Sequence, residues 1–203
     1  KCNTDVLFIG SAYMGRKKII NKLKRKGINI KCFGYGWEKK PISDDEISEY
    51  IKDKKPLVLC LNINKDFPSD LVTAYAACHE TRITIELDLY LDLTKPIILP
   101  MGRIPNAIKE LLLNVDILDY GLRIKEGNFK ISNNGCILDK PLVLMYALSL
   151  SSVSGANRIL LSGVDGYEKN NPKQQEMITA LNQFKENNAN VEIYAITPTT
   201  YPI

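Results

Sequence analysis

The chain has 203 residues, 45% of them hydrophobic and 25% charged, which predicts one globular domain over residues 1–203 with enough length to bury a core. No apolar run approaches the roughly 18 residues that a membrane-spanning helix needs, so we expect no membrane span. The net charge is only +4, and the basic stretch at residues 15–31 contains no aromatic residue that would stack on a base, which argues against a nucleic-acid partner. The first residue is Lys1 rather than Met, which leaves open that the chain is a piece of a longer protein.

The N-terminal part of the sequence alternates between strand-like and helix-like stretches. Short apolar runs predict strands, and stretches with helical spacing between them predict helices. In chain order we expect a strand at 5–10, a helix at 15–27, a strand at 28–37, a helix at 43–54 and a strand at 56–63. Ser43 and Glu46 have the spacing of a capping box at the start of the second helix.

The rest of the sequence continues this alternation around a turn-rich stretch. Residues 70–78 fit either a strand or a short helix, residues 115–122 fit a strand or a turn, and residues 126–137 predict a β excursion. The remaining expected elements are helices at 104–114, 141–156 and 171–188, and strands at 95–100, 157–163 and 191–197. This alternation predicts an α/β fold, a single Rossmann-like domain with a mostly parallel sheet and helices on both faces.

The cysteines and the histidine bear on metal binding and on location. The five cysteines are widely spaced and form no C-x-x-C pair, and there is only one histidine, so we expect no metal site. Cys32, Cys60 and Cys78 lie in apolar, strand-like stretches, where a reduced cysteine behaves as a small hydrophobe. We therefore expect a reducing compartment, the cytoplasm.

Polar residues follow the predicted strands, at the edge where parallel sheets bind ligands. Gly10 and Ser11 open a loop between a strand and a helix that could hold an anion, although the loop matches neither G-x-G-x-x-G nor the Walker pattern; the alternative is a tight turn. Asn62 and Asn64 follow the strand at 56–63 and suit a ribose or a base edge. The alternative is a turn whose side chains bind its own backbone.

Five further residues are candidates for chemistry. His79, the only histidine, suits proton transfer near neutral pH, and the alternative is a partly buried histidine satisfied by backbone. Asp165 follows the strand at 157–163 and either accepts hydrogen bonds from sugar hydroxyls or caps the next helix. Tyr167 could donate to a phosphate, and Glu168 or Glu176 could act as a base. The end of the chain either lines the same cleft or is a polar tail, with Thr197, Thr199, Thr200 and Tyr201.

Two resemblances rest on the C-terminal motifs. The stretch "YALSLSSVSGANRILLSGVDGY", followed by a helix and "VEIYAITP", is similar to the C-terminal half of the bacterial lipooligosaccharide sialyltransferases, in which an alanine-rich helix, a glycine turn and a strand lead into a G-[IV]-D-x-Y motif. The segments "LNIN", "AYAACHETR", "ILDYGL", "GANRILLSGVDGY" and "ITPTTYPI" resemble a domain found after aldolase-type domains in some bacterial cell-surface polysaccharide proteins. The second resemblance covers most of the chain, and the first mainly its last third.

The sialyltransferase resemblance implies sugar transfer from a CMP-activated donor, with no required metal and no cofactor. It matches Asp165 and Tyr167 to the motif, Asn62 or Asn64 to the asparagine of the third-strand motif, and His79 to a loop asparagine. Two departures stand out. The family's Thr-Ser-Gly phosphate turn is replaced by "DKPLVL", and the place of its histidine base is taken by residues 168–170, Glu-Lys-Asn.

Two functions therefore stay open. The first is a glycosyltransferase-like domain acting on a nucleotide-activated (CMP-type) sugar in cell-surface polysaccharide biosynthesis. The second is a non-catalytic carbohydrate- or nucleotide-binding module that accompanies an aldolase-type enzyme, fused to it or as its partner. In the first, the catalytic candidates are His79, Asp165 and Glu168, and the substrate-binding candidates are Gly10, Ser11, Asn62, Asn64 and Tyr167. The sequence makes no prediction of the acceptor or of the oligomeric state.

Overall fold

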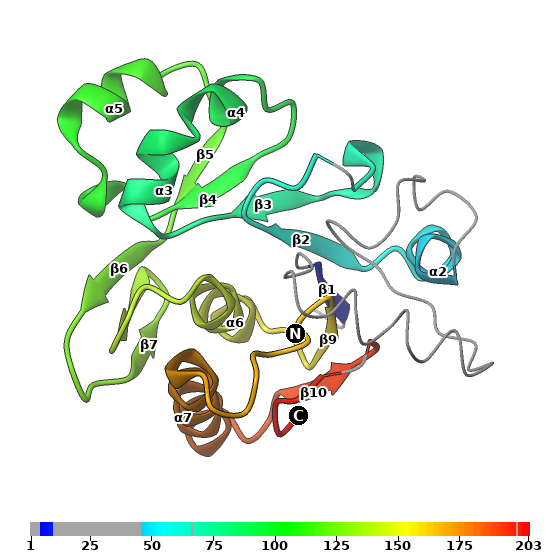
Figure 1. Ribbon diagram of the computed structural model, residues 1–203. Helices are drawn as coiled ribbons and strands as arrows, with labels where there is room; N and C mark the ends of the chain where they lie inside the picture. The colour runs from blue at the N-terminus through cyan, green and yellow to red at the C-terminus, as the bar shows by residue number, and fades with distance from the viewer. Residues whose placement is uncertain (1–4, 10–45, 66, 198) are drawn as a thin grey trace.

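The computed structural model describes residues 5–9, 46–65, 67–197 and 199–203 (Figure 1). One sheet contains seven strands: β1 (Asp5–Ile9), β2 (Leu57–Leu61), β3 (Ala74–Ala76), β4 (Ile97–Leu99), β5 (Ile117–Asp119), β9 (Arg158–Ser162) and β10 (Glu192–Ala195). A second sheet contains three: β6 (Gly121–Ile124), β7 (Lys130–Ser132) and β8 (Gly135–Leu138). The helices of the described residues are α2 (Glu46–Lys54), α3 (Glu80–Ile85), α4 (Leu87–Leu91), α5 (Asn106–Leu111), α6 (Val143–Val153) and α7 (Pro172–Asn187), with short 3-10 turns η1 (Ser69–Leu71) and η2 (Met101–Arg103).

The large sheet has the strand order β10-β9-β1-β2-β3-β4-β5, and every neighbouring pair in it is parallel. The small sheet has the order β6-β8-β7, with one parallel and one antiparallel pair. The predicted α/β fold with a mostly parallel sheet is therefore confirmed. The small sheet is the β excursion expected at residues 126–137, extended by β6.

Strands β2, β3, β4 and β9 of the large sheet are buried on both faces. Along β2, Leu59 belongs to the core beneath α6, α7 and the small sheet, whereas Cys60 belongs to the core beneath α2, α3 and α4. On β9, Leu161 belongs to the first of these cores and Leu160 belongs to the second. Successive side chains of a strand point to opposite faces, so strands that are apolar throughout need cover on both sides, and the helices supply it. Figure 1 shows α6 and α7 together on one side of the sheet, with α3, α4 and α5 gathered beside β4 and β5.

The structure differs in detail from several of the elements predicted from sequence. The ambiguous residues 70–78 contain strand β3, and residues 115–122 contain both β5 and β6. The sequence assigned no element to residues 79–93, where the structure has the helices α3 and α4. The helix expected at 141–156 is shorter in the structure, where α6 spans Val143–Val153. The helix and strand expected at 15–27 and 28–37, and the cap Ser43, lie outside the described residues.

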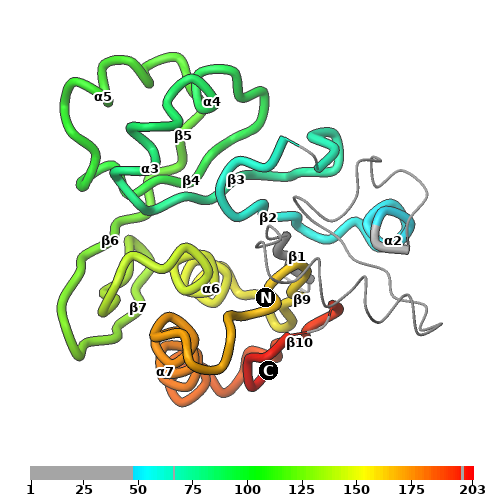
Figure 2. The backbone as a smooth tube through the Cα atoms, in the orientation of Figure 1, coloured from blue at the N-terminus to red at the C-terminus, as the bar shows by residue number. Residues whose placement is uncertain are grey.

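The chain end returns to the large sheet. Figure 2 shows the C-terminus beside β10 and β9, and the backbone amide of Thr200 donates to the carbonyl of Asp165 at 2.7 Å. The segment after β10 therefore lies against the loop that follows β9, at the edge where both strands end.

Candidate functional site

The strand order reverses direction between β1 and β9. From β1 the chain adds β2, β3, β4 and β5 on one side, and then returns to place β9 and β10 on the other side. Ile9, the last residue of β1, is paired with Ser162, the last residue of β9. In open parallel sheets the connections before and after such a reversal diverge, and the crevice they leave at the carboxyl ends is where ligands bind. The loop after β9, residues 163–171, starts at this position.

The loop after β9 is held by the segment after β10. Gly163 donates its backbone amide to Thr197 Oγ1 at 2.8 Å, and Thr199 Oγ1 donates to the carbonyl of Val164 at 2.7 Å. The threonines of the chain end thus bind backbone groups of the neighbouring loop. This arrangement gives them a structural role that a free polar tail would not have.

Gly166, Gln174 and Thr200 complete this contact. Gly166 has φ +93°, and a Cβ on it would lie 2.0 Å from Thr200 Oγ1. Gln174, on α7, is only 5% exposed. Its Oε1 accepts from the backbone amide of Tyr167 at 2.7 Å, and its Nε2 donates to Thr200 Oγ1 at 3.0 Å and to the Thr200 carbonyl at 3.2 Å. A single buried amide therefore joins α7 to both loops and fixes the path of residues 165–167.

Asp165 and Tyr167 lie in this fixed loop. Asp165 is partly buried, its Oδ2 atom is shielded from solvent, and its carbonyl accepts from the amide and the hydroxyl of Thr200. The ring of Tyr167 is partly buried against the core, with Lys173 Nζ 5.9 Å from the ring centroid. These hydrogen bonds hold the backbone of both residues without help from a ligand.

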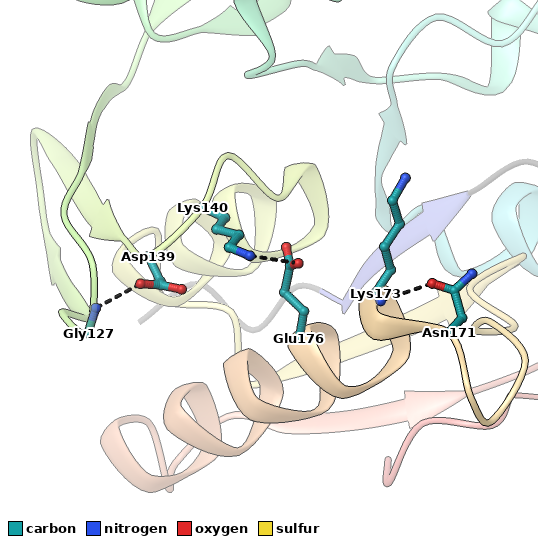
Figure 3. Close-up of polar contacts among 6 residues, drawn as sticks. All are labelled: Gly127, Asp139, Lys140, Asn171, Lys173 and Glu176. Carbon is teal, nitrogen blue, oxygen red and sulfur yellow. Dashed lines mark hydrogen bonds and ion pairs between the residues drawn. The ribbon is translucent and has the colours of Figure 1, made fainter.

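The alternative in which Asp165 caps the following helix is wrong. Helix α7 begins at Pro172, and the cap is Asn171, whose side chain accepts from the backbone amide of Lys173 at 3.0 Å (Figure 3). Glu168 is exposed and belongs to the turn before the cap, since its carbonyl accepts from the amide of Asn171 at 2.8 Å. The alternative base, Glu176, forms an ion pair with Lys140 at 3.0 Å.

Asn62 and Asn64 follow β2 and differ in surroundings. Asn62 has φ +59°, a left-handed conformation that asparagine tolerates. Its backbone amide donates to the carbonyl of Ala76 at 2.8 Å. This is the conformation of a turn. Asn64 is 5% exposed and lines a cavity of about 540 Å³ between residues 63–65 and 67–69, Tyr75, α4 and residues 92–94. Its backbone amide also binds the thiol of Cys60, but burial dominates and raises the pKa of that thiol to about 12.

His79 is exposed and lies farther along the same edge. It is the residue before α3, and its carbonyl accepts from the amide of Ile83 at 3.0 Å, while its side chain makes no capping hydrogen bond. It follows β3, which is separated from β9 by β2 and β1. Three strand spacings amount to about 14 Å, so His79 and Asp165 face the same edge without touching each other.

The structure also shows polar groups that sequence reasoning did not assign to the site. Gln174 and Ser162 carry no motif. Ser162 is fully buried, and its Oγ has no hydrogen-bond partner within the described part of the chain. Nothing in the sequence near either residue marks them, because their positions depend on pairing with β1 and on contacts with the chain end. Gly10 and Ser11 lie outside the described residues.

The described residues also bear on metal binding and on membrane spans. Residues 5–9, 46–65, 67–197 and 199–203 contain no group of three or more His, Cys, Asp or Glu side chains arranged to hold a metal ion. In the same ranges no helix has both the length and the apolar composition to cross a membrane.

Comparisons with known proteins identify no relative of this chain. No protein-family model matches the chain, and no curated protein or solved structure matches it significantly.

Proposed function

We propose that the chain is a single Rossmann-like domain of the cytoplasm that binds a nucleotide-activated sugar of the CMP type at the carboxyl edge of its large sheet. In this proposal it is a glycosyltransferase-like domain in cell-surface polysaccharide biosynthesis, as the sialyltransferase resemblance implies. One observation carries the proposal: the strand order reverses beside β9, and the loop that holds Asp165 is fixed at that reversal by Gln174 and Thr200.

The positions of Asn64 and Asp165 suit a ligand that has a nucleoside at one end and a sugar at the other. Asn64 lines the cavity of about 540 Å³ next to β2, a volume in the range of small-molecule sites, and supports binding of a nucleoside there. Asp165 follows β9, two strands away, or about 10 Å. A nucleoside near Asn64 and a sugar near Asp165 would be joined by the phosphate across the end of β1.

The second candidate is a non-catalytic carbohydrate- or nucleotide-binding module that works with an aldolase-type enzyme. A specific observation favours it. His79 is exposed and follows β3, which lies about three strand spacings from β9, and this separation disfavours a mechanism in which the imidazole and the Asp165 carboxylate act on one atom. Of the catalytic candidates, only Glu168 shares the loop of Asp165.

Isothermal titration with CMP and with a CMP-activated sugar tests the binding proposal. We expect wild-type protein to bind both ligands, and the Asp165→Asn variant to bind the CMP-sugar at least tenfold more weakly while its CMP affinity changes little. Asp116→Asn is the matched control, because Asp116 is exposed and lies just before β5, at the opposite edge of the sheet. Absence of binding by wild-type protein, or an equal loss in both variants, contradicts the proposal.

A second measurement separates the two candidates. The glycosyltransferase-like function is supported if wild-type protein releases CMP from the CMP-sugar and the Asp165→Asn variant does not. Binding of the CMP-sugar without any release of CMP supports the module.

A further inference from the structure

A second cavity lies between α7 and the small sheet, and we call it the α7 groove. Its volume is about 560 Å³. It is walled on one side by α7 and on the other by the turn between β6 and β7 and the segment from β8 to the start of α6. The site proposed above does not account for it, although Glu176, a candidate base from the sequence, is among its lining residues.

The floor of the α7 groove is apolar and includes an aromatic ring. Phe129, Leu142 and Met145 contribute to it. Phe129 packs edge-on against Phe184, with centroids 6.3 Å apart and planes at 79°, which fixes the orientation of its ring. A fixed, partly buried ring offers a surface on which the C–H face of a sugar ring can pack.

The rim of the α7 groove is polar and predominantly acidic. Three carboxylates, Glu126, Asp139 and Glu176, and one ammonium, Lys140, leave a net charge of −2. Lys140 Nζ donates to Glu176 Oε2 at 3.0 Å, and Asp139 Oδ1 accepts from the backbone amide of Gly127 at 2.7 Å (Figure 3). That hydrogen bond to Oδ1 holds the Asp139 carboxylate at the rim of the groove. Carboxylates held in this way accept hydrogen bonds from hydroxyl groups and repel anions.

The α7 groove adjoins the proposed donor site. Pro172 lines the groove, and Lys173, the next residue, lies over the ring of Tyr167 in the loop after β9. The first turn of α7 therefore separates the two sites by only a few residues. From its location and its chemistry we infer that the α7 groove binds the acceptor, a saccharide that is neutral or carries an amino group and is not anionic. This inference rests on the proposed function.

Saturation-transfer NMR with three named sugars tests this inference: lactose, glucosamine and glucuronate. We expect transfer from the protein to lactose and glucosamine and at least fivefold less to glucuronate. Asp139→Asn should reduce the transfer to glucosamine by a factor of at least three. No transfer to lactose or to glucosamine overturns the inference, as does glucuronate binding as well as the other two.

Two tryptophan variants on α7 locate the binding. Thr179 is exposed and lines the groove, whereas Asn182 is exposed and does not line it. Thr179→Trp should abolish transfer to lactose, and Asn182→Trp should leave it unchanged. Because both positions are exposed, neither variant disturbs the core. Equal effects of the two variants overturn the placement.

The titration with CMP separates this inference from the proposed function. CMP binding without saccharide binding overturns the inference and leaves the proposed function standing. Saccharide binding at the α7 groove without CMP binding contradicts the proposed function and with it the acceptor role.

Discussion

Gly166 and Thr200 are packed so closely that no side chain fits between them: a Cβ on Gly166 would lie 2.0 Å from Thr200 Oγ1. The contact joins the loop after β9 to the chain end, which is 34 residues further along the sequence (200 − 166). Because Gly166 also has φ +93°, its backbone conformation is one that only glycine adopts readily. The position of Asp165 therefore depends on a glycine and on a threonine from the chain end.

Replacing Gly166 with alanine is expected to lower the free energy of unfolding by about 3 kcal/mol, because the strain of the positive φ adds to the clash with Thr200. Urea denaturation measures this change. Two glycines provide matched controls: Gly127 has φ +66° with open space around its Cβ, and Gly102 has open space and no positive φ. We expect losses in the order Gly166→Ala, then Gly127→Ala, then Gly102→Ala. A Gly166→Ala variant as stable as Gly127→Ala would show that the loop moves away freely.

Gln174→Leu removes the amide that joins the two loops. The backbone amide of Tyr167 loses its acceptor in a partly buried position, and we expect stability to fall by about 2–3 kcal/mol. We also expect affinity for a CMP-sugar to fall, since the Asp165 loop loses its support. Asn182→Leu on the same helix is the control, because Asn182 is exposed and does not line the α7 groove. Chemical denaturation of both variants, followed by titration, gives the comparison, and equal stability losses would refute the role of Gln174.

The main architecture could be predicted from sequence because the large sheet depends on local patterns. Apolar runs such as those at β2 and β9 end in polar residues. Strands that are buried on both faces are apolar almost throughout, so they can be recognised without an alternating pattern. Helices α3 and α4 were missed for a physical reason. The stretch "ITIELDLYLDL" alternates apolar and polar residues, which is a strand period, but Ile83 and Tyr90 are packed into the core from short helices of six and five residues.

The site was less predictable than the fold. The position of Asp165 just after a strand could be expected from its motif, and the reason that its loop is rigid could not. Gln174 and Thr200 are 26 residues apart in sequence, and Thr200 is 35 residues from Asp165. Such contacts arise from the adjacency of β9 and β10 and from the return of the chain end, and no local pattern encodes them.

Asn62 allows the turn and the ligand-binding interpretations to be separated. Its φ of +59° is tolerated by glycine, so Asn62→Gly should change stability by less than about 1 kcal/mol. If the side-chain amide of Asn62 binds the nucleoside, the Asn62→Gly variant should bind CMP at least fivefold more weakly. Lys55, with φ +49°, is the control, and Lys55→Gly should leave CMP affinity unchanged. Unaltered affinity in Asn62→Gly would leave Asn62 as a turn residue only.

The buried thiols predict how stability depends on pH. Burial raises the pKa of Cys60 from its ordinary value of 9.0 to about 12, so between these values the folded chain retains a proton that the unfolded chain has lost. The stabilisation is complete below pH 9 and is lost as pH rises towards 12, at about 1.4 kcal/mol per pH unit. We expect Cys60→Ala to show a slope shallower by that amount in urea denaturation between pH 9 and 11.

Val58→Ala is the control for this slope. Val58 is 1% exposed and belongs to the same core as Cys60, but it has no proton to lose. Its replacement should lower stability equally at every pH. A slope that is the same in Cys60→Ala as in wild-type protein would contradict a raised pKa for this thiol.

The measurement that tests the central claim most directly is amide hydrogen exchange with and without CMP. If a nucleotide binds at the carboxyl edge where the strand order reverses, exchange should slow in residues 61–65 and 162–168, the segments that follow β2 and β9. Residues 156–158 and 190–192, where β9 and β10 begin, should not change. Protection confined to those opposite ends, or no protection at saturating CMP, would contradict the account.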